Sequence, residues 1–197
     1  MNCVFCNIDK SKVENTIIDE TDNFIVLPAI GSLIDGYLLI VSKRHINSMA
    51  ELMENEKIEY EFLIKKYRNL FKNNYNKFPI IFEHGCPVID SDMKANSIVH
   101  AHTHIVNHKF IDENTIIKRL NFNRIDNLSY ISKEKNYIMY INPDNVCYLT
   151  NHFEPVSQMM RKIIAKDLGY ESKFNWKKEM FIENINSTIK KFKKGSN

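Results

Sequence analysis

The feature that most constrains the fold is an alternation of histidines in residues 97–106, which read Ser-Ile-Val-His-Ala-His-Thr-His-Ile-Val. Side chains along an extended strand point alternately to the two faces of a sheet. His100, His102 and His104 are therefore predicted to share one face, about 6 to 7 Å apart. Three aligned imidazoles are costly to bury without partners. A single histidine would be an ordinary partly buried residue, whereas three in strict alternation indicate a functional site.

Hydrophobic patterning predicts a strand pair, a buried central strand and then a long helix. The strand pair covers residues 16–20 and 23–28, and the almost wholly apolar central strand covers residues 36–43. Ser48 and Glu51 match a capping box at a helix start. The helix that follows carries an apolar stripe, which fits either the core of one chain or a dimer interface. The stripe consists of Ile58, Phe62, Leu63, Tyr67, Leu70 and Phe71.

The second half of the chain has strands and helices of its own, with no obvious linker before it. Between the long helix and this second half, residues 78–83 are predicted to form a strand and residues 86–96 a loop. The elements predicted after residue 110 are a helix at 112–120, a hairpin of 137–142 and 146–150, and two helices at 156–168 and 176–193.

Composition bounds the class of protein. With 197 residues, 44% hydrophobic and 26% charged, the chain can bury a real core. The net charge of +3 does not call for a nucleic-acid partner, and the basic residues 190–194 fit a solvated helix end. The sequence has neither a secretory signal pattern nor an apolar run long enough to cross a bilayer. We therefore expect a cytoplasmic protein with no membrane partner, whose cysteines are not paired as disulfides.

Two motifs leave their chemistry open at this point. Cys3-x-x-Cys6 fits a metal site or a redox pair, although no βαβ pattern surrounds it as a thioredoxin-like site requires. The alternating histidines also fit a catalytic metal site, but zinc hydrolases of this kind add an acid or another histidine soon after. Here His108 follows, and no acid appears before Asp112, so the spacing does not decide between the alternatives.

The histidine segment resembles the signature of the histidine-triad (HIT) family. His100-x-His102-x-His104-Ile-Val follows Asn96-Ser97-Ile98, and residues 23–26 and 36–46 resemble a second conserved block of that family. The resemblance covers about residues 1–108. It implies an α+β fold with an antiparallel sheet and one long helix packed on it. Residues 1–108 are then the histidine-triad domain, and residues 109–197 an α/β extension packed on the first half.

The resemblance also implies an activity and roles for individual residues. Enzymes of this family hydrolyse or transfer nucleotidyl groups at the α-phosphate of phosphoramidates, adenylated conjugates or dinucleoside polyphosphates, through a nucleotidyl-histidine. His102 is then the nucleophile, and a neutral imidazole suits that role at pH 7. His104 would donate to a phosphate oxygen. Ser97 takes the place of the phosphate-contacting hydroxyl, and Asn96 stands where a glutamine is usual.

A structural zinc site is implied by the same resemblance. Cys3, Cys6, His45 and His100 are similar to the ligands of the zinc site in many bacterial members of the family. Two thiolates and two imidazoles suit a closed tetrahedral zinc, one per chain, that cannot itself activate water. The alternative is an empty site.

Three positions depart from the better-known members. Ala29 stands where a ribose-binding Asp or Asn is usual, and Glu83 stands close to an expected phosphate contact, where its charge would be repulsive unless it is protonated or paired. Arg161 or an amino group of the substrate could pair with Glu83. The third departure is the missing proline after the histidines, with a long continuation of the chain.

The Phe-Glu-His-Gly sequence at 82–85 is similar to an extended branch of the family, which implies that His84, Gln158 and Arg161 approach the substrate. For Arg161 the alternative is an ordinary solvated charge on a helix. A small-molecule nucleotide substrate and a homodimer formed through the long helix are also implied. The rival function is a non-catalytic, zinc-stapled module that binds a nucleotide or a protein partner without turnover.

Overall fold

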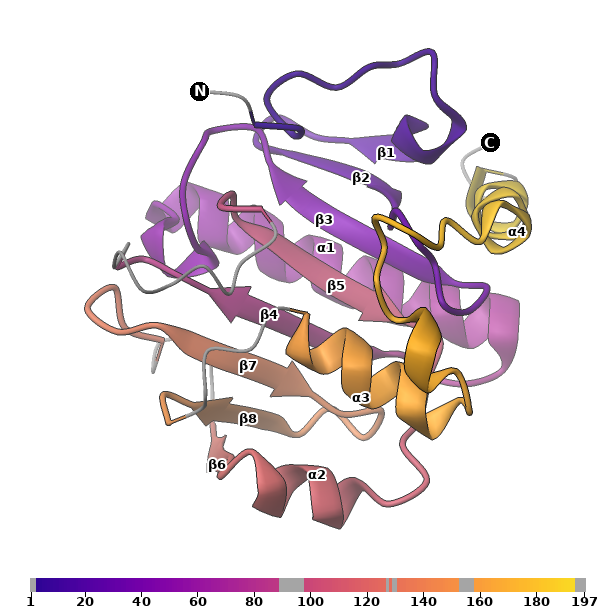
Figure 1. Cartoon of the computed structure of the whole chain (residues 1–197). Helices are drawn as coiled ribbons and strands as arrows, with labels where there is room; N and C mark the ends of the chain where they lie inside the picture. The colour runs from indigo at the N-terminus through magenta and orange to yellow at the C-terminus, as the bar shows by residue number, and fades with distance from the viewer. Residues whose placement is uncertain (1–2, 89–97, 127, 129–130, 153–157, 194–197) are drawn as a thin grey trace.

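The chain forms one eight-stranded antiparallel sheet flanked by helices (Figure 1). The computed structural model describes residues 3–88, 98–126, 128, 131–152 and 158–193. The strand order is β1-β2-β3-β5-β4-β7-β8-β6, and every neighbouring pair is antiparallel. The predicted α+β class with an antiparallel sheet is confirmed.

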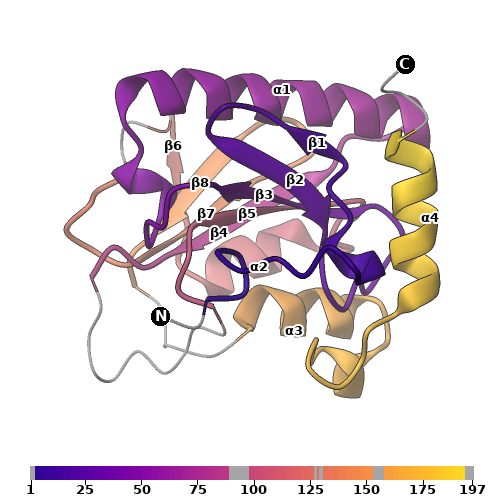
Figure 2. The ribbon, with the colours of Figure 1, turned by 90° about the horizontal axis from the view of Figure 1, so that it is seen from above.

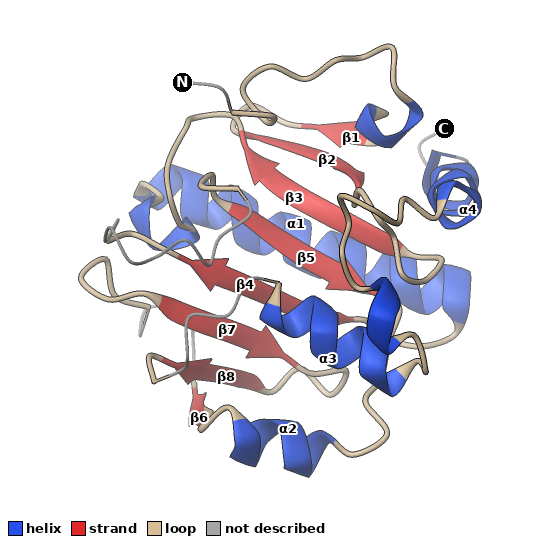
Figure 3. Cartoon of the chain, in the orientation of Figure 1, coloured by secondary structure: helices blue, strands red, loops and turns tan. Residues whose placement is uncertain are grey.

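The bounds of the elements are as follows, and Figure 3 distinguishes helices from strands. The strands are β1 Asp19–Glu20, β2 Phe24–Pro28, β3 Tyr37–Ser42, β4 Ile80–Gly85, β5 His102–Val106, β6 Asn123–Ile125, β7 Tyr137–Ile141 and β8 Cys147–Thr150. The α-helices are α1 Glu54–Tyr75, α2 Glu113–Arg119, α3 Met159–Asp167 and α4 Ile182–Lys193. Short 3-10 turns cover Val13–Asn15, Met49–Glu51 and Glu171–Lys173.

Most predicted elements are present, with shifted ends. The capping box at Ser48 opens a 3-10 turn, and the α-helix proper begins at Glu54. The last helix begins at Ile182 and not at residue 176. Strand β6, which the sequence patterning did not predict, pairs with β8 at the sheet edge. The strand of the histidine segment is shorter than predicted, because it begins at His102 and leaves His100 just before it.

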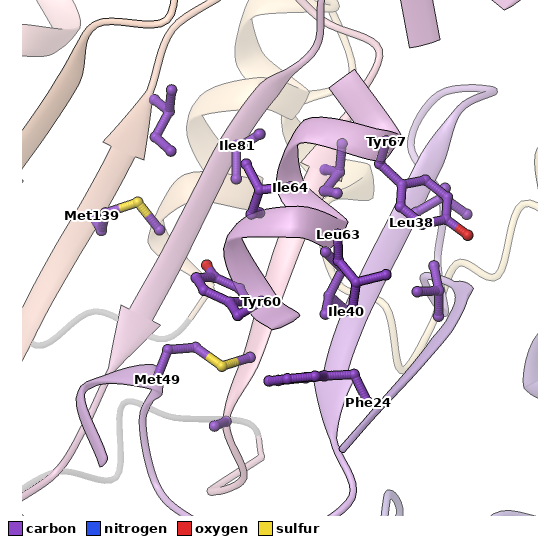
Figure 4. Close-up of a cluster of buried hydrophobic side chains, with 14 of the residues drawn as sticks. Phe24, Leu38, Ile40, Met49, Tyr60, Leu63, Ile64, Tyr67, Ile81 and Met139 are labelled. Atoms are coloured by element: carbon purple, nitrogen blue, oxygen red, sulfur yellow. The ribbon is translucent and has the colours of Figure 1, made fainter. Parts of the chain in front are cut away.

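Helix α1 covers one face of the sheet, and α2 and α3 lie on the other (Figure 2). Its apolar face packs on the sheet through a cluster of buried side chains, of which Tyr60, Leu63, Ile64 and Tyr67 are labelled in Figure 4. These positions recur every three or four residues, which is the spacing of one helix face. Because this cluster fills the face of the sheet under α1, the histidine site lies on the opposite face.

The predicted apolar stripe was wrong for two of its members. Ile58 is 71% exposed and Phe62 is 62% exposed, whereas Tyr60 and Ile64 of the same helix are buried. Ile58 and Phe62 are four residues apart and share the helix face turned away from the sheet. The face of α1 that packs on the sheet is therefore rotated about the helix axis from the face that the apolar residues alone predicted.

The second half of the chain extends the sheet of the first half. Strand β7 pairs with β4 over five residue pairs, from Ile81 opposite Ile141 to Gly85 opposite Tyr137. The outer edge of β4 is thus occupied by a strand of the same chain. Met160, Ile164 and Ala165 of α3 are buried in the cluster that covers the face opposite α1.

Helix α4 is tied to the segment between β2 and β3. The Thr188 hydroxyl oxygen accepts a hydrogen bond of 2.8 Å from the backbone N–H of Gly36, and Lys191 forms an ion pair with Asp35. The ring of Phe192 packs 4.9 Å from the ring of Phe71 in α1. Within the described ranges, no helix is both long enough and apolar enough to cross a membrane.

Candidate active site and metal cluster

The alternation of strand β5 separates its side chains between the two faces of the sheet. Thr103 points toward α1, where its hydroxyl lies 2.8 Å from the hydroxyl of Tyr60. His102 and His104 lie opposite Val41 and Leu39 of β3 and face the other way, with ring centres 4.9 Å apart. The ring of Phe5 contacts both His100 and His102, so these two imidazoles also lie on the same side.

His102 is held by its own strand. Its Nδ1 atom lies 2.6 Å from the backbone carbonyl oxygen of His100. A carbonyl can only accept a hydrogen bond, so Nδ1 carries the proton and Nε2 keeps its lone pair. Burial lowers the pKa of His102. The ring is therefore a neutral imidazole with an unprotonated Nε2.

His104 is held by a tyrosine and a phenylalanine. The Tyr37 hydroxyl lies 2.9 Å from Nδ1 of His104, and the ring of Phe82 stacks on the imidazole at 4.4 Å between centres, with 11° between the planes. Burial lowers the pKa of His104 well below its usual value, and the charge of Arg161 lowers it further. His104 is thus neutral at pH 7, with its ring plane restricted.

A pocket opens over these two histidines, between the sheet and α3. It brings together a mostly apolar wall and His84, Gln158 and Arg161, the three residues predicted as substrate contacts. Asn96 and Ser97, the other two predicted contacts, lie outside the described residues. The lining consists of Phe5, Ala29, Ile30, Leu39, Phe82, His84, Ile98, His102, His104, Ile138, Gln158, Met159, Met160, Arg161 and Trp176.

The wall of the pocket comes from segments that are far apart in the sequence. Phe5 comes from the N-terminal segment, and Arg161 and Trp176 come from the last 40 or so residues. Ala29, where a ribose-binding side chain is usual, also lines the pocket and offers no side-chain hydrogen bond. Burial lowers the pKa of His84 to about 4, so this ring too is neutral at pH 7.

Arg161 is buried and not a solvated helix charge, which overturns that alternative. Its side chain belongs to α3 and is only 5% exposed. Its Nε–H donates to the backbone carbonyl of Phe174 at 3.0 Å, and an Nη2–H donates to that of Gly31 at 2.5 Å. A guanidinium is always charged, so a fixed positive charge sits in the pocket wall.

Glu83 does not face the pocket, and the expected repulsion of a phosphate was wrong. In β4, Phe82 and His84 point to the histidine face, so Glu83 points to the α1 face. Its carboxyl accepts hydrogen bonds of 2.7 Å from the backbone N–H of Met49 and from the hydroxyl of Tyr137. Burial raises the pKa of Glu83 to about 7. The pairing with Arg161 was also wrong, since Arg161 lies on the opposite face.

Cys3, Cys6, His45 and His100 form a compact cluster beside the pocket, with one ligand atom of each lying within 4.8 Å of all the others. The Nδ1 atom of His100 lies 3.3 Å from Sγ of Cys3, 3.6 Å from Sγ of Cys6 and 3.1 Å from Nδ1 of His45. In the described ranges this is the one His, Cys, Asp and Glu group able to hold a metal, and it includes neither His102 nor His104. The structure therefore does not support a metal site built from the three alternating histidines.

The cluster fits a tetrahedral metal by its distances and its protonation. Zinc bonds of about 2.1 Å to nitrogen and 2.3 Å to sulfur place tetrahedral ligand atoms roughly 3.3 to 3.8 Å apart, close to the spacings seen here. Nε2 of His100 lies 2.7 Å from the carbonyl oxygen of Ser42 and must donate to it. Nδ1 of His100 therefore keeps its lone pair and directs it into the cluster, as a metal ligand requires.

Sequence reasoning missed Phe5 and Trp176, which line the pocket, and Tyr37, which contacts His104. Tyr37 lies on the same strand face as Leu39, so its position could be deduced from the pairing of β3 with the histidine strand. Phe5 lies between the two cysteines, which could have placed it beside His100. Trp176 carries no such local signal, because only the packing of the last segment against Gly31 brings it to the pocket.

Comparison with known proteins assigns the family. A model of the family described as "Scavenger mRNA decapping enzyme C-term binding" matches residues 2–119, which is more than half of the chain. Among solved structures, a hypothetical histidine triad nucleotide-binding protein from Sulfolobus tokodaii is 20% identical, with a TM-score of 0.42 over 53% of this chain and 67% of that one.

Two bacterial structures are similar to a comparable degree. A zinc-bound histidine triad family protein from Mycobacterium smegmatis is 19% identical, with a TM-score of 0.43 over 57% of this chain and 79% of that one. A HIT family hydrolase from Clostridium thermocellum is 22% identical, with a TM-score of 0.41 over 56% and 94%. With its family model matched across residues 2–119, the chain belongs to the family described as "Scavenger mRNA decapping enzyme C-term binding".

Proposed function

We propose that this chain is a nucleotidyl hydrolase or transferase that acts at the α-phosphate of a nucleotide through a covalent intermediate on His102. The substrate class is a phosphoramidate, an adenylated conjugate or a dinucleoside polyphosphate. The observation that carries the proposal is the 2.6 Å contact between Nδ1 of His102 and the carbonyl of His100, which leaves Nε2 as a nucleophile in the pocket.

The first step is attack of the Nε2 lone pair of His102 on the α-phosphorus. A phosphorus–nitrogen bond forms, the bond between phosphorus and the leaving group breaks, and the leaving group departs with the electron pair of that bond. Water, or another acceptor in a transferase, then displaces the histidine and restores its lone pair. Over both steps, one hydrogen of the water ends on the leaving group and the rest of the water on the released nucleotide.

The pocket offers groups that would stabilise the phosphate during these steps. His104 would donate a hydrogen bond to a non-bridging oxygen, and the charge of Arg161 favours an anion nearby. We further propose that His84 and Gln158, which line the same pocket, contact the substrate, and that Asn96 and Ser97 contact the phosphate.

Zinc is the metal we propose for the cluster of Cys3, Cys6, His45 and His100, one ion per chain. We propose with it that the chain belongs to the zinc-containing, bacterial-type branch of the histidine-triad family. When bound, a closed zinc site supplies no catalytic water and ties the N-terminal segment to the sheet. The ligand atoms within 4.8 Å of one another support the assignment.

The organisation of the chain forms part of the same proposal. Residues 1–108 would act as the histidine-triad domain, and residues 109–197 as an extension that completes the pocket. We propose a homodimer that uses the exposed Ile58 and Phe62 of α1, because β7 already occupies the outer edge of β4. The proposal also includes a small-molecule nucleotide partner and a cytoplasmic location. It includes no nucleic-acid partner and no membrane partner.

The test is turnover of nucleoside 5′-phosphoramidates, adenylated amines and dinucleoside polyphosphates by the wild type and by His102→Ala. We expect His102→Ala to abolish turnover while nucleotide binding persists. His152→Ala, which changes an exposed histidine that is not part of the pocket lining, serves as the control. Unchanged turnover in His102→Ala excludes the covalent role, and binding without turnover by the wild type favours the non-catalytic module.

A further inference from the structure

We propose that Tyr37 and Arg161 are positioning residues that fix the proton of His104 on Nε2. This inference rests on the proposed function, because it gives His104 the donor that a phosphate oxygen needs. It begins with an ambiguity in the contact between the Tyr37 hydroxyl and Nδ1 of His104, which are 2.9 Å apart. Either group can donate, and the two choices leave opposite forms of Nε2 in the pocket.

The two forms have opposite effects on an anionic substrate. If the Tyr37 hydroxyl donates, Nδ1 accepts and Nε2 carries a hydrogen that can bind a phosphate oxygen. If Nδ1–H donates to the tyrosine oxygen, Nε2 presents a lone pair that repels the phosphate. Only the first form suits the proposed chemistry.

Arg161 resolves the ambiguity. Its guanidinium carbon lies 5.6 Å from the centre of the Tyr37 ring. Burial raises the pKa of the Tyr37 hydroxyl, and the charge of Arg161 opposes that rise. A guanidinium has donors and no acceptor. The lone pairs of the tyrosine oxygen therefore turn toward Arg161, and its hydrogen turns toward Nδ1 of His104.

The surroundings hold this arrangement in place. Arg161 is anchored by the carbonyls of Gly31 and Phe174, and Tyr37 is fully buried in β3. The stacked ring of Phe82 restricts rotation of the His104 imidazole. The charge, the phenol and the imidazole therefore cannot rearrange without the loss of buried contacts.

This chain of contacts assigns a function to the C-terminal half of the protein. Arg161 comes from α3, Tyr37 from β3 and His104 from β5, so residues that follow the histidine-triad signature set the proton position of a histidine within it. With two of its N–H groups bound to backbone carbonyls, Arg161 acts on His104 through Tyr37.

The test is the tautomer of His104, measured by long-range proton–nitrogen NMR of the full-length protein labelled with ¹⁵N-histidine, without substrate. We expect protonated Nε2 and unprotonated Nδ1 in His104. His102 is an internal control of the opposite kind, because its Nδ1 donates to the His100 carbonyl. Tyr37→Phe and Arg161→Met are each expected to move His104 toward the Nδ1–H form and to leave His102 unchanged.

Kinetics then separate positioning from substrate binding. In Tyr37→Phe, which keeps the ring and loses only the hydroxyl, we expect kcat to fall about 10- to 100-fold with little change in KM. Wild-type His104 with its proton on Nδ1 overturns the proposal even if Arg161→Met does not fold. An unchanged tautomer in both variants also overturns it. The tautomer is measured without turnover. A failure of the proposed function is therefore recognised by a different result, namely activity that persists in His102→Ala.

Discussion

The ring of Phe5 lies 5.3 Å from the ring of His102, and Phe5 stands between Cys3 and Cys6 in the sequence. The segment that supplies the two thiols of the Cys/His cluster therefore also supplies one wall of the pocket. His100, a member of the cluster, also holds Nδ1 of His102 through its backbone carbonyl, so the cluster contacts the proposed nucleophile in two ways. This relationship couples the proposed zinc site to the proposed active site.

The cluster is expected to hold about one zinc per chain, measured by elemental analysis of the purified protein. Cys6→Ser removes one ligand, and we expect loss of the metal together with a fall in the melting temperature, because metal binding contributes to folding. Cys147→Ser is the matched control, since this thiol is not part of the cluster and should leave the metal content unchanged. Wild-type protein purified without any metal contradicts the assignment.

Phe5→Ala is expected to reduce kcat/KM about tenfold while the zinc content stays the same, because the variant keeps every proposed ligand and loses the aromatic contact with His102. The fluorescence of Trp176, the only tryptophan of the chain, reports ligand binding in the same pocket. Full activity in Phe5→Ala would mean that the contact does not position His102.

Glu83→Gln is expected to change how stability depends on pH. The folded pKa of about 7 lies above the ordinary value, so the folded state binds this proton more tightly than the unfolded state does. The stabilisation is therefore complete below about pH 4.5 and is lost as the pH rises to about 7, by roughly 3 kcal/mol. The difference between wild type and Glu83→Gln, measured by urea unfolding from pH 4 to 8, isolates this contribution from those of the histidines. A difference that does not vary with pH contradicts it.

Gly31→Ala is expected to destabilise the protein and disturb the pocket wall. Gly31 has φ +68°, and an added Cβ would lie 2.7 Å from the backbone Cα of Trp176. Gly169→Ala is a matched control, because Gly169 has φ +75° and an added Cβ would meet nothing within 4 Å. Backbone strain alone should cost the control about 1 kcal/mol, and Gly31→Ala should cost more. Thermal unfolding and Trp176 fluorescence measure the two effects, and equal costs would contradict the close packing.

Phe62→Asp is expected to convert the proposed homodimer to a monomer, as measured by light scattering across a range of concentrations. Phe62 is 62% exposed on α1, so a charge there should not disturb the core. Ile111→Asp, at a residue that is 86% exposed elsewhere, is the control. A monomeric wild type, or a dimer that survives Phe62→Asp, rules out this interface.

The histidine face and the positions of most strands along the chain could be predicted from local periodicity. Alternation along a strand follows from backbone geometry alone, so His102 and His104 share a face wherever the strand lies in the fold. The same reasoning was weaker for α1, because two exposed residues, Ile58 and Phe62, are as apolar as the buried ones. Strand β6, only three residues long, is too short for a periodic signal.

The orientation of Glu83 and the burial of Arg161 could not be predicted from residue types. Glu83 was expected near a phosphate because of its neighbours in sequence, but strand alternation turns it toward Tyr137 on the other face. Arg161 resembles any charged residue of a helix, and only the carbonyls of Gly31 and Phe174 hold it in the pocket wall. The surroundings of both residues are supplied by segments that are distant from them in the sequence.

The amino-acid sequence by itself determined the histidine alternation, which follows from the geometry of an extended strand. The antiparallel α+β class and the cysteine and histidine cluster were predicted from the resemblance of sequence motifs to the histidine-triad family. Only the tertiary structure decided which nitrogen of each imidazole faces the pocket and which residues support it. Tyr37 and His104 are 67 positions apart, and Gly31 and Arg161 are 130 apart. Contacts of that range, and the burial that holds the imidazoles neutral, arise only when the whole chain packs.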